Sequence, residues 1–206
     1  MDTKQRILDE ALTLFSEKGY ANVYVADIAE RVGIKAPSLY KHYKSKQAIF
    51  DAIIDEMSTR FVEQARSLNI EGNDAGKDAE IYKNITEDEL VGLGMQLFGY
   101  FLHDDHNRKF RKMLTLEQFR DEQLAKTYSK IYVDDPLTYQ GMLFGIMAAQ
   151  GILCTDNVPV MTIHFYAPIY YFLTICDREP AREKEVLVLL EEHIRQFNKL
   201  YGRKAV

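Results

Sequence analysis

The sequence is poor in residues that break helices and in residues that cross-link a chain. Its 206 residues include only 11 Gly, 5 Pro and 2 Cys. So little Gly and Pro favours long helices over many short strands. Two isolated cysteines, Cys154 and Cys176, exclude a disulfide framework, and we interpret them as buried, reduced thiols that suit a reducing cytoplasm. Because 47% of the residues are hydrophobic, the chain can bury a sizeable core, which excludes a disordered or collagen-like protein.

No apolar run followed by a small-residue cleavage site stands at the amino terminus, so we expect no signal peptide. Two stretches without charged residues, 137–155 and 158–176, are each long enough to span a bilayer. They contain Gln140, Gln150 and His164, and acidic residues flank them where a membrane protein would show Lys or Arg. We therefore expect interior or interface helices of a cytoplasmic protein.

Charge is distributed unevenly along the chain. The net charge of −5 divides into +2 for residues 1–50, from 8 basic and 6 acidic residues, and −7 for the rest. The segment 31–50 holds five Lys and Arg side chains, His42 and no acid. Charge alone leaves two interpretations open, a module that binds a polyanion or a solvated helix face.

Apolar residues recur at three- and four-residue spacing along most of the chain, which predicts an all-α fold. Thr86 with Glu89 forms a capping box at the start of one helix. Residues 69–83, with Gly72 and Gly76, predict a loop with at most one helical turn. We expect helices over about 3–18, 25–32, 37–42, 46–68, 86–103, 107–114, 116–132, 136–153, 159–176 and 181–201.

The short helices 25–32 and 37–42, joined by a tight turn through Gly33, form a helix-turn-helix, in which the second helix enters the major groove of DNA. Leu39 and Tyr43, four residues apart, are expected to pack inward. The side chains of Ser38, Tyr40, Lys41 and His42 would then point outward. Lys46 stands at the start of the next helix, where a phosphate would meet both its ammonium group and the helix N-terminus.

Four motifs stand at fixed spacing in residues 3–50: Phe15–Gly19–Tyr20, Asp27–Ile28–Ala29, Val32–Gly33–Ile34 and the run from Ser38 to Lys46. Through them this segment resembles the DNA-binding region of TetR-type (TetR/AcrR) transcriptional regulators. One departure is visible, because the family usually has Thr or Ser just before the second helix and this chain has Val23 and Tyr24. Either the cap of that helix is lost, or Tyr24 supplies the hydroxyl contact.

The resemblance implies an N-terminal three-helix DNA-binding domain, residues 1–47, and a larger helical domain for ligand binding and dimerisation, residues 48–206. It implies a homodimer that binds an inverted-repeat operator, most simply as a repressor, and that a small organic effector releases. Neither a cofactor nor a membrane is implied. Base contacts are implied for Lys35, Ala36, Pro37, Ser38 and Lys41, and phosphate contacts for Tyr24, Tyr40, His42 and Lys46.

Beyond residue 50 the expectations are less specific. The small residues of 136–153 suggest that this helix forms a dimer bundle with 181–201, against the alternative of core packing within one subunit. Aromatic and Met residues with polar neighbours are the candidates for a ligand pocket, although such stripes are often ordinary core. They are Tyr100, His103, Phe119, Tyr139, Met142, Phe144, His164 and Tyr170.

The run His103-Asp104-Asp105-His106 has a possible metal-ligand spacing, but we interpret it as a polar helix end and predict no metal site. The sequence has no Gly-rich phosphate loop, no Gly-x-Ser-x-Gly elbow and no His-Glu-x-x-His motif. We therefore expect no enzyme. The alternative to a regulator is a helical, dimeric ligand-binding or adaptor protein that does not bind an operator.

Overall fold

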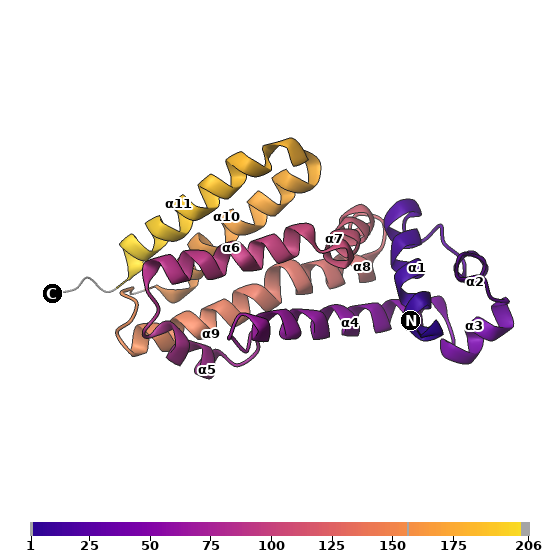
Figure 1. The fold of residues 1–206 in the computed structure, drawn as a ribbon, viewed down its shortest axis with the longest axis horizontal. Coiled ribbons are helices and arrows are strands. Elements are labelled where there is room, and N and C mark those ends of the chain that lie inside the picture. The colour runs from indigo at the N-terminus through magenta and orange to yellow at the C-terminus, as the bar shows by residue number, and fades with distance from the viewer. Residues whose placement is uncertain (1, 156, 203–206) are drawn as a thin grey trace. The chain divides into compact units, whose positions relative to one another are not determined.

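The computed structural model describes residues 2–155 and 157–202, and its regular structure is helical throughout these ranges (Figure 1). In the described residues, β-type pairing is limited to one isolated antiparallel bridge between Leu153 and Gly202. The expected all-α fold class is thus confirmed. The helices are α1 (Thr3–Lys18), α2 (Val25–Val32), α3 (Ala36–His42), α4 (Lys46–Ser67), α5 (Ala75–Tyr82), α6 (Glu87–His103), α7 (Asp105–Glu117), α8 (Glu122–Ser129), a π-helical segment (Lys130–Asp134), α9 (Asp135–Ala149), α10 (Val158–Arg178), a 3-10 turn (Pro180–Arg182) and α11 (Glu183–Tyr201).

Helix α6 begins at the capping box that the sequence predicts. The backbone N–H of Glu89 donates to Thr86 Oγ1 at 3.3 Å, and the backbone N–H of Thr86 donates to Glu89 Oε2 at 2.8 Å. These bonds satisfy donors that a helix start leaves unpaired. The bonds that the Thr86 N–H and hydroxyl donate to Glu89 also hold the pKa of its carboxyl below its ordinary value.

The prediction of a loop over 69–83 was wrong, because α5 forms there. Asp74 caps this helix by accepting the backbone N–H of Lys77 at 3.1 Å. Asp78, only 1% exposed, accepts the backbone N–H groups of Glu71 at 2.7 Å and Gly72 at 2.9 Å, and also the hydroxyl of Tyr139. A buried carboxylate that is satisfied in this way fixes the segment before α5.

Two further expectations fail. The helix predicted over 116–132 is interrupted after α7, since the Asp121 carboxylate accepts the backbone N–H of Leu124 at 3.0 Å and starts α8 as a new helix. Cys154, expected to be buried, is exposed, whereas Cys176 is buried as expected.

The chain divides into two compact units. The first comprises Met1–Phe61 and Asp104–Tyr128, so it takes in α7 and the first part of α4 besides the DNA-binding segment 1–47 expected from the sequence. Its core gathers round Phe15, which is fully buried, and the ring of Tyr20 lies between the rings of Phe15 and Phe50 at 5.1 and 5.2 Å. The N-terminal helices are thereby held on one apolar centre.

The second unit comprises Val62–His103 and Ser129–Val206. In it α10 packs on α6, α9 and α11, and α5 packs on α9. By length and composition α10 is the one helix in the described residues that is apolar enough to cross a membrane, although it packs on three other helices here. Its buried side chains, among them Met161 and Phe172, form part of the core of this unit, but only 28% of its most apolar stretch is buried.

Candidate nucleic-acid interface

The turn between α2 and α3 is built on a left-handed glycine. Gly33 has φ +78° and ψ +31°, a conformation that L side chains adopt at a cost. After it, the backbone N–H of Ile34 donates to the carbonyl of Ala29 at 2.9 Å, which closes the end of α2. The guanidinium of Arg6, on α1, donates to the carbonyl of Val32 at 2.6 Å. A positive charge thus caps the negative end of α2 and ties it to α1.

Helix α3 buries one side and exposes the other, as the sequence predicts. Leu39 is fully buried and Tyr43 is 6% exposed. The residues for which DNA contacts are expected lie on the remaining surface, where Lys35, Pro37, Tyr40, Lys41 and His42 are exposed and Ala36 and Ser38 are half-buried. The structure brings these candidates together on one face, although their contacts with DNA stay a prediction.

The start of α2 explains the departure at Val23 and Tyr24. Val23 is fully buried, and Tyr24 occupies the N-cap position with its side chain 70% exposed. The backbone N–H of Tyr24 donates to Asp27 Oδ2 at 2.7 Å. The acidic half of a capping box therefore holds this helix start, and the Tyr24 side chain is accessible for the expected phosphate contact.

Lys46 has a structural partner in addition to its expected phosphate contact. Its Nζ donates to the carbonyl of Tyr20 at 2.7 Å and lies 4.3 Å from the centroid of the Tyr20 ring. Burial lowers the pKa of Lys46, while the charge of Glu117 acts against this shift. Because an ammonium group has three donors, Lys46 can donate to the carbonyl of Tyr20 and still donate to a phosphate.

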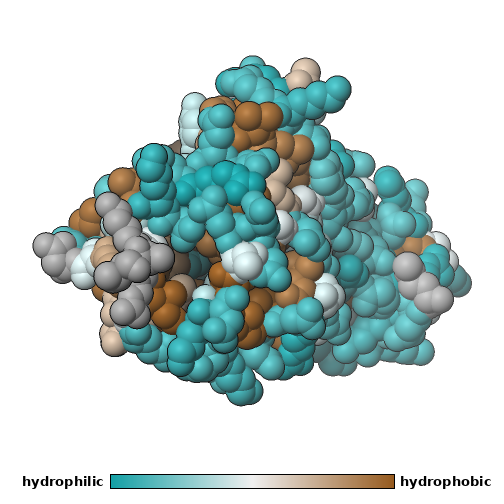
Figure 2. Space-filling model, turned by 60° about the vertical axis from the view of Figure 1, so that its left-hand side comes forward, coloured by the Kyte–Doolittle hydropathy of each residue, from teal (hydrophilic) through white to brown (hydrophobic). Residues whose placement is uncertain are grey.

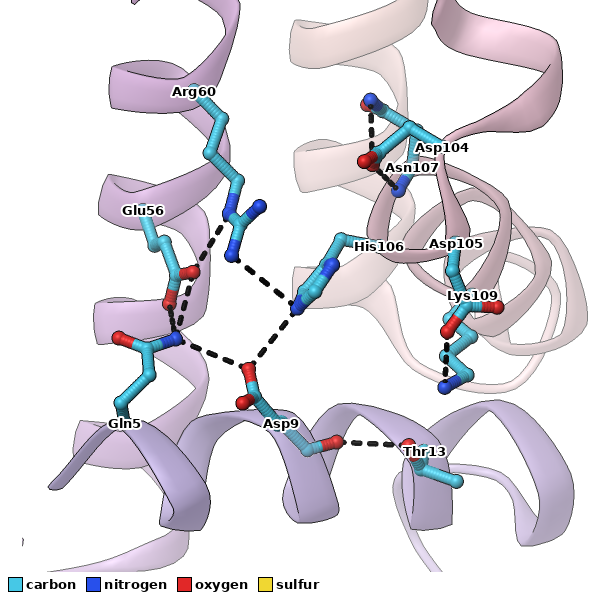
Figure 3. A network of polar contacts seen from close by, with 10 residues as sticks. All are labelled: Gln5, Asp9, Thr13, Glu56, Arg60, Asp104, Asp105, His106, Asn107 and Lys109. Carbon is cyan, nitrogen blue, oxygen red and sulfur yellow. Dashed lines mark hydrogen bonds and ion pairs between the residues drawn. The ribbon is translucent and has the colours of Figure 1, made fainter. Parts of the chain in front are cut away.

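A polar network that the sequence did not predict joins α1, α4 and α7 within the first unit (Figure 3). His106 Nε2 lies 3.0 Å from Asp9 Oδ1 and 3.4 Å from Arg60 Nη2. Arg60 Nε donates to Glu56 Oε1 at 2.7 Å. The side chain of Gln5 donates to Glu56 at 2.9 Å and to Asp9 at 3.1 Å. The partners stand up to 97 positions apart, so no local pattern reveals them.

The second unit contains an apolar cavity of about 490 Å³. Its polar lining includes Gln140, Asn198, Glu87, Lys83 and Tyr82, and burial raises the pKa of the Tyr82 hydroxyl to about 12. The hydroxyl therefore stays protonated at neutral pH. The apolar lining comes from α6, α9, α10, α11 and the segment after α9, and it comprises Leu90, Leu93, Leu97, Leu143, Phe144, Met147, Ile152, Leu153, Phe165, Ile194 and Phe197.

Of the eight residues predicted to line a pocket, Phe144 lines this cavity. The others are spread over the chain and are not brought together. Phe119 is 89% and Met142 54% exposed. Each of the other five has a partner elsewhere. Tyr100 contacts the ring of Phe101, and Tyr170 contacts the ring of Tyr166. His103 pairs with the carboxylate of Glu183, Tyr139 with the carboxylate of Asp78, and His164 with the hydroxyl of Tyr201.

Comparison with known sequences agrees with the helix-turn-helix. Residues 7–53 match the family described as bacterial regulatory proteins, tetR family. A curated relative, the negative transcriptional regulator IcaR of the icaADBC biofilm operon of Staphylococcus epidermidis, is 42% identical over 60 residues. That match covers 29% of this chain and 32% of IcaR, so the chain matches about a third of the length of this relative.

Solved structures share the fold over nearly the whole chain. MexZ of Pseudomonas aeruginosa, a repressor responsible for antibiotic resistance, superposes with a TM-score of 0.74 over 96% of this chain and 93% of MexZ, at 18% identity. The complex of SmeT with triclosan gives a TM-score of 0.72 over 98% of this chain and 93% of SmeT, also at 18% identity. SmeT is the repressor of the multidrug efflux pump SmeDEF of Stenotrophomonas maltophilia.

The fold and the exposed face of α3 define the class of this protein, a helical protein with a helix-turn-helix of the DNA-binding type. The resemblance to TetR-type regulators noted in the sequence is confirmed for residues 7–53. Beyond that segment the chain shares its fold with MexZ and SmeT.

Substitutions in and beside α3 separate base reading from phosphate binding. Lys41→Ala removes an exposed donor from the outward face of α3, and we expect it to cost about 1–3 kcal/mol at the preferred site and to relax one base position. Lys46→Ala should weaken binding to all sequences alike and lower the salt dependence by about one unit per subunit. Affinities measured by fluorescence anisotropy on specific and random duplexes at several salt concentrations check both.

Lys44→Ala is the matched control, since Lys44 is exposed and lies beyond the end of α3. It should leave base preference unchanged. Equal losses on specific and random DNA for Lys41→Ala would contradict a base-reading role.

Proposed function

We propose that this chain is a ligand-responsive transcriptional repressor of the cytoplasm rather than an enzyme. On this proposal it binds an inverted-repeat operator as a homodimer, and a small organic effector releases it. The observation that carries the proposal is the face of α3, where the buried Leu39 turns Lys35, Tyr40 and Lys41 toward solvent. The repressor role draws support from IcaR, MexZ and SmeT, each of which is described as a negative regulator or repressor.

Selection from a random duplex library tests the operator. Because a two-fold protein dimer presents two recognition helices, we expect an enriched inverted repeat with half-sites about one helical turn apart or slightly more. Enrichment of no motif would support the alternative, a helical ligand-binding or adaptor protein without operator binding. A motif without two-fold symmetry would contradict the homodimer.

Helices α10 and α11 offer a better dimer surface than the pair expected from the sequence, 136–153 with 181–201. On α10, Ile163 is 50% and Tyr171 58% exposed, and on α11 Val188 is 59% and Leu200 62% exposed. Apolar side chains also interrupt the hydrophilic surface at the top of Figure 2, where Figure 1 places α10 and α11. Exposed apolar side chains on two helices that pack on each other favour a partner.

Charged substitutions distinguish the two surfaces. We expect Ile163→Asp or Val188→Asp to produce monomers and to weaken operator binding at least tenfold, because each places a charge inside the apolar interface. Met142→Asp on α9, at a site of similar exposure, is the matched control and should leave the dimer intact. Molar masses by light scattering check this. A monomer from Met142→Asp alone would place the interface on α9.

The effector is assigned to the cavity of about 490 Å³. A second hollow of about 850 Å³ runs along α11, but it is more open and is lined by Glu192, Arg195 and Lys199 among others. The smaller cavity is the less open of the two, and most of its lining is apolar, as is usual for a small-molecule site. The structural relative SmeT, which was solved with triclosan, makes triclosan a suitable first probe.

Filling the cavity should uncouple the effector from DNA. Linkage requires that an effector and the operator weaken each other by the same factor, corresponding to about 1–3 kcal/mol. We expect Leu97→Trp, which adds a bulky ring to the lining, to abolish release by triclosan or another hit from a thermal-shift screen and to leave operator affinity unchanged. Operator binding with and without ligand measures both effects.

Ile81→Trp, on the exposed surface of α5, is the control and should retain the response. Release that persists in Leu97→Trp would contradict this cavity as the effector site. A ligand whose affinity does not change with saturating operator would not be an effector.

A further inference from the structure

Three side chains with metal-binding groups meet in the first unit. Asp9 on α1, Glu56 on α4 and His106 on α7 each offer a ligand atom, and these atoms lie within 4.8 Å of one another. All three residues are half-buried. The pair His106 Nε2 and Asp9 Oδ1 is already separated by 3.0 Å, close to the spacing between two ligands about 2.1 Å from one zinc ion. Figure 3 shows their side chains converging from three helices.

The charges of this cluster leave room for a divalent cation. Asp9, Glu56 and Asp104 all act electrostatically on Arg60, whose guanidinium carries a permanent positive charge. Three carboxylates and one guanidinium sum to −2. Arg60 is one third exposed and is attached to α4 by a long, flexible stem. It can therefore turn out to solvent and release both Glu56 and His106 from their contacts.

Gln5 adds a further ligand. Its amide now donates to Asp9 and to both oxygens of Glu56. Rotation of the amide by half a turn presents its oxygen, in place of its nitrogen, to the space between Asp9 and Glu56. The donor set then consists of one imidazole, two carboxylates and one amide oxygen, which suits a borderline transition metal such as Zn²⁺ more than Mg²⁺.

We propose that Asp9, Glu56 and His106 form a binding site for a divalent transition-metal ion, which takes the place of the Arg60 guanidinium. The ion joins α1, α4 and α7 through bonds stronger than the present hydrogen bonds. It stabilises the first unit by mass action, because the unfolded chain does not bring the three ligands together. The site accounts for the convergence of acids and a histidine that the helix-turn-helix does not require.

Titration of the untagged full-length protein with Co²⁺ and Zn²⁺ tests the site. We expect one ion bound per chain, d–d absorption by Co²⁺ of the intensity typical of four or five ligands, and a rise in Tm with Zn²⁺. His106→Gln should lower the affinity for both ions by at least tenfold, since it removes the nitrogen ligand. Arg60→Ala should raise the affinity by about tenfold, because it removes the competing positive charge.

His103→Gln is the matched control, as His103 belongs to the same His-Asp-Asp-His run but pairs with Glu183 at 3.2 Å. It should bind both ions as the unchanged protein does. Absence of Co²⁺ binding by the unchanged protein, or binding that survives His106→Gln, would overturn the proposal. A loss of affinity in Arg60→Ala would do the same, since it would make Arg60 a support of the cluster rather than a competitor for it. If His106→Gln failed to fold, its loss of metal binding would be no support for the site. The increase in metal affinity expected for Arg60→Ala tests the site independently of that variant.

Discussion

The burial of Leu39 is the contact on which the DNA-binding surface depends. Helix α3 has only seven residues, and an isolated helix of this length is unstable in water because nucleation costs more than so few hydrogen bonds return. Its conformation therefore depends on tertiary packing, and Leu39 is the residue of α3 that is buried, followed by the buried Tyr43 at its C-cap. The same packing decides which side chains face solvent. Fold stability and DNA recognition are thus set by opposite sides of one short helix.

The core beneath α3 is supported in turn by polar anchors at its edges. Arg6 holds the end of α2, and Lys46 holds the carbonyl of Tyr20 after α1. Each anchor joins segments 26 positions apart and satisfies a backbone carbonyl near a helix end. Partly buried bonds of this kind, made by a charged donor, contribute more than neutral ones. They hold the N-terminal helices around Phe15 and restrict the movement of the segments between these helices.

Local signals in the sequence predicted much of the structure of the N-terminal helices and less of the structure of the remaining chain. The bounds of α1 and α2, the inward packing of Leu39 and the capping box of α6 all follow from periodicity and capping over a few residues. Helix α5 was missed because its support comes from Asp78, whose partners include Tyr139 on α9, 61 positions away. The lining of the cavity was missed for a related reason. Aromatic and polar residues were chosen as candidates, whereas the side chains that meet there are mainly Leu, Ile and Phe of ordinary core type.

The comparisons separate a short sequence match from a long structural one. The family match covers residues 7–53 and the match to IcaR 60 residues at 42% identity, while the fold is shared with MexZ along almost the whole chain at 18% identity. A helix-turn-helix requires particular residues at particular positions, such as glycine at the left-handed Gly33. A helical core requires only apolar side chains of suitable volume, so many sequences satisfy it. On the proposed function, the second unit is therefore free to change its ligand without changing its fold.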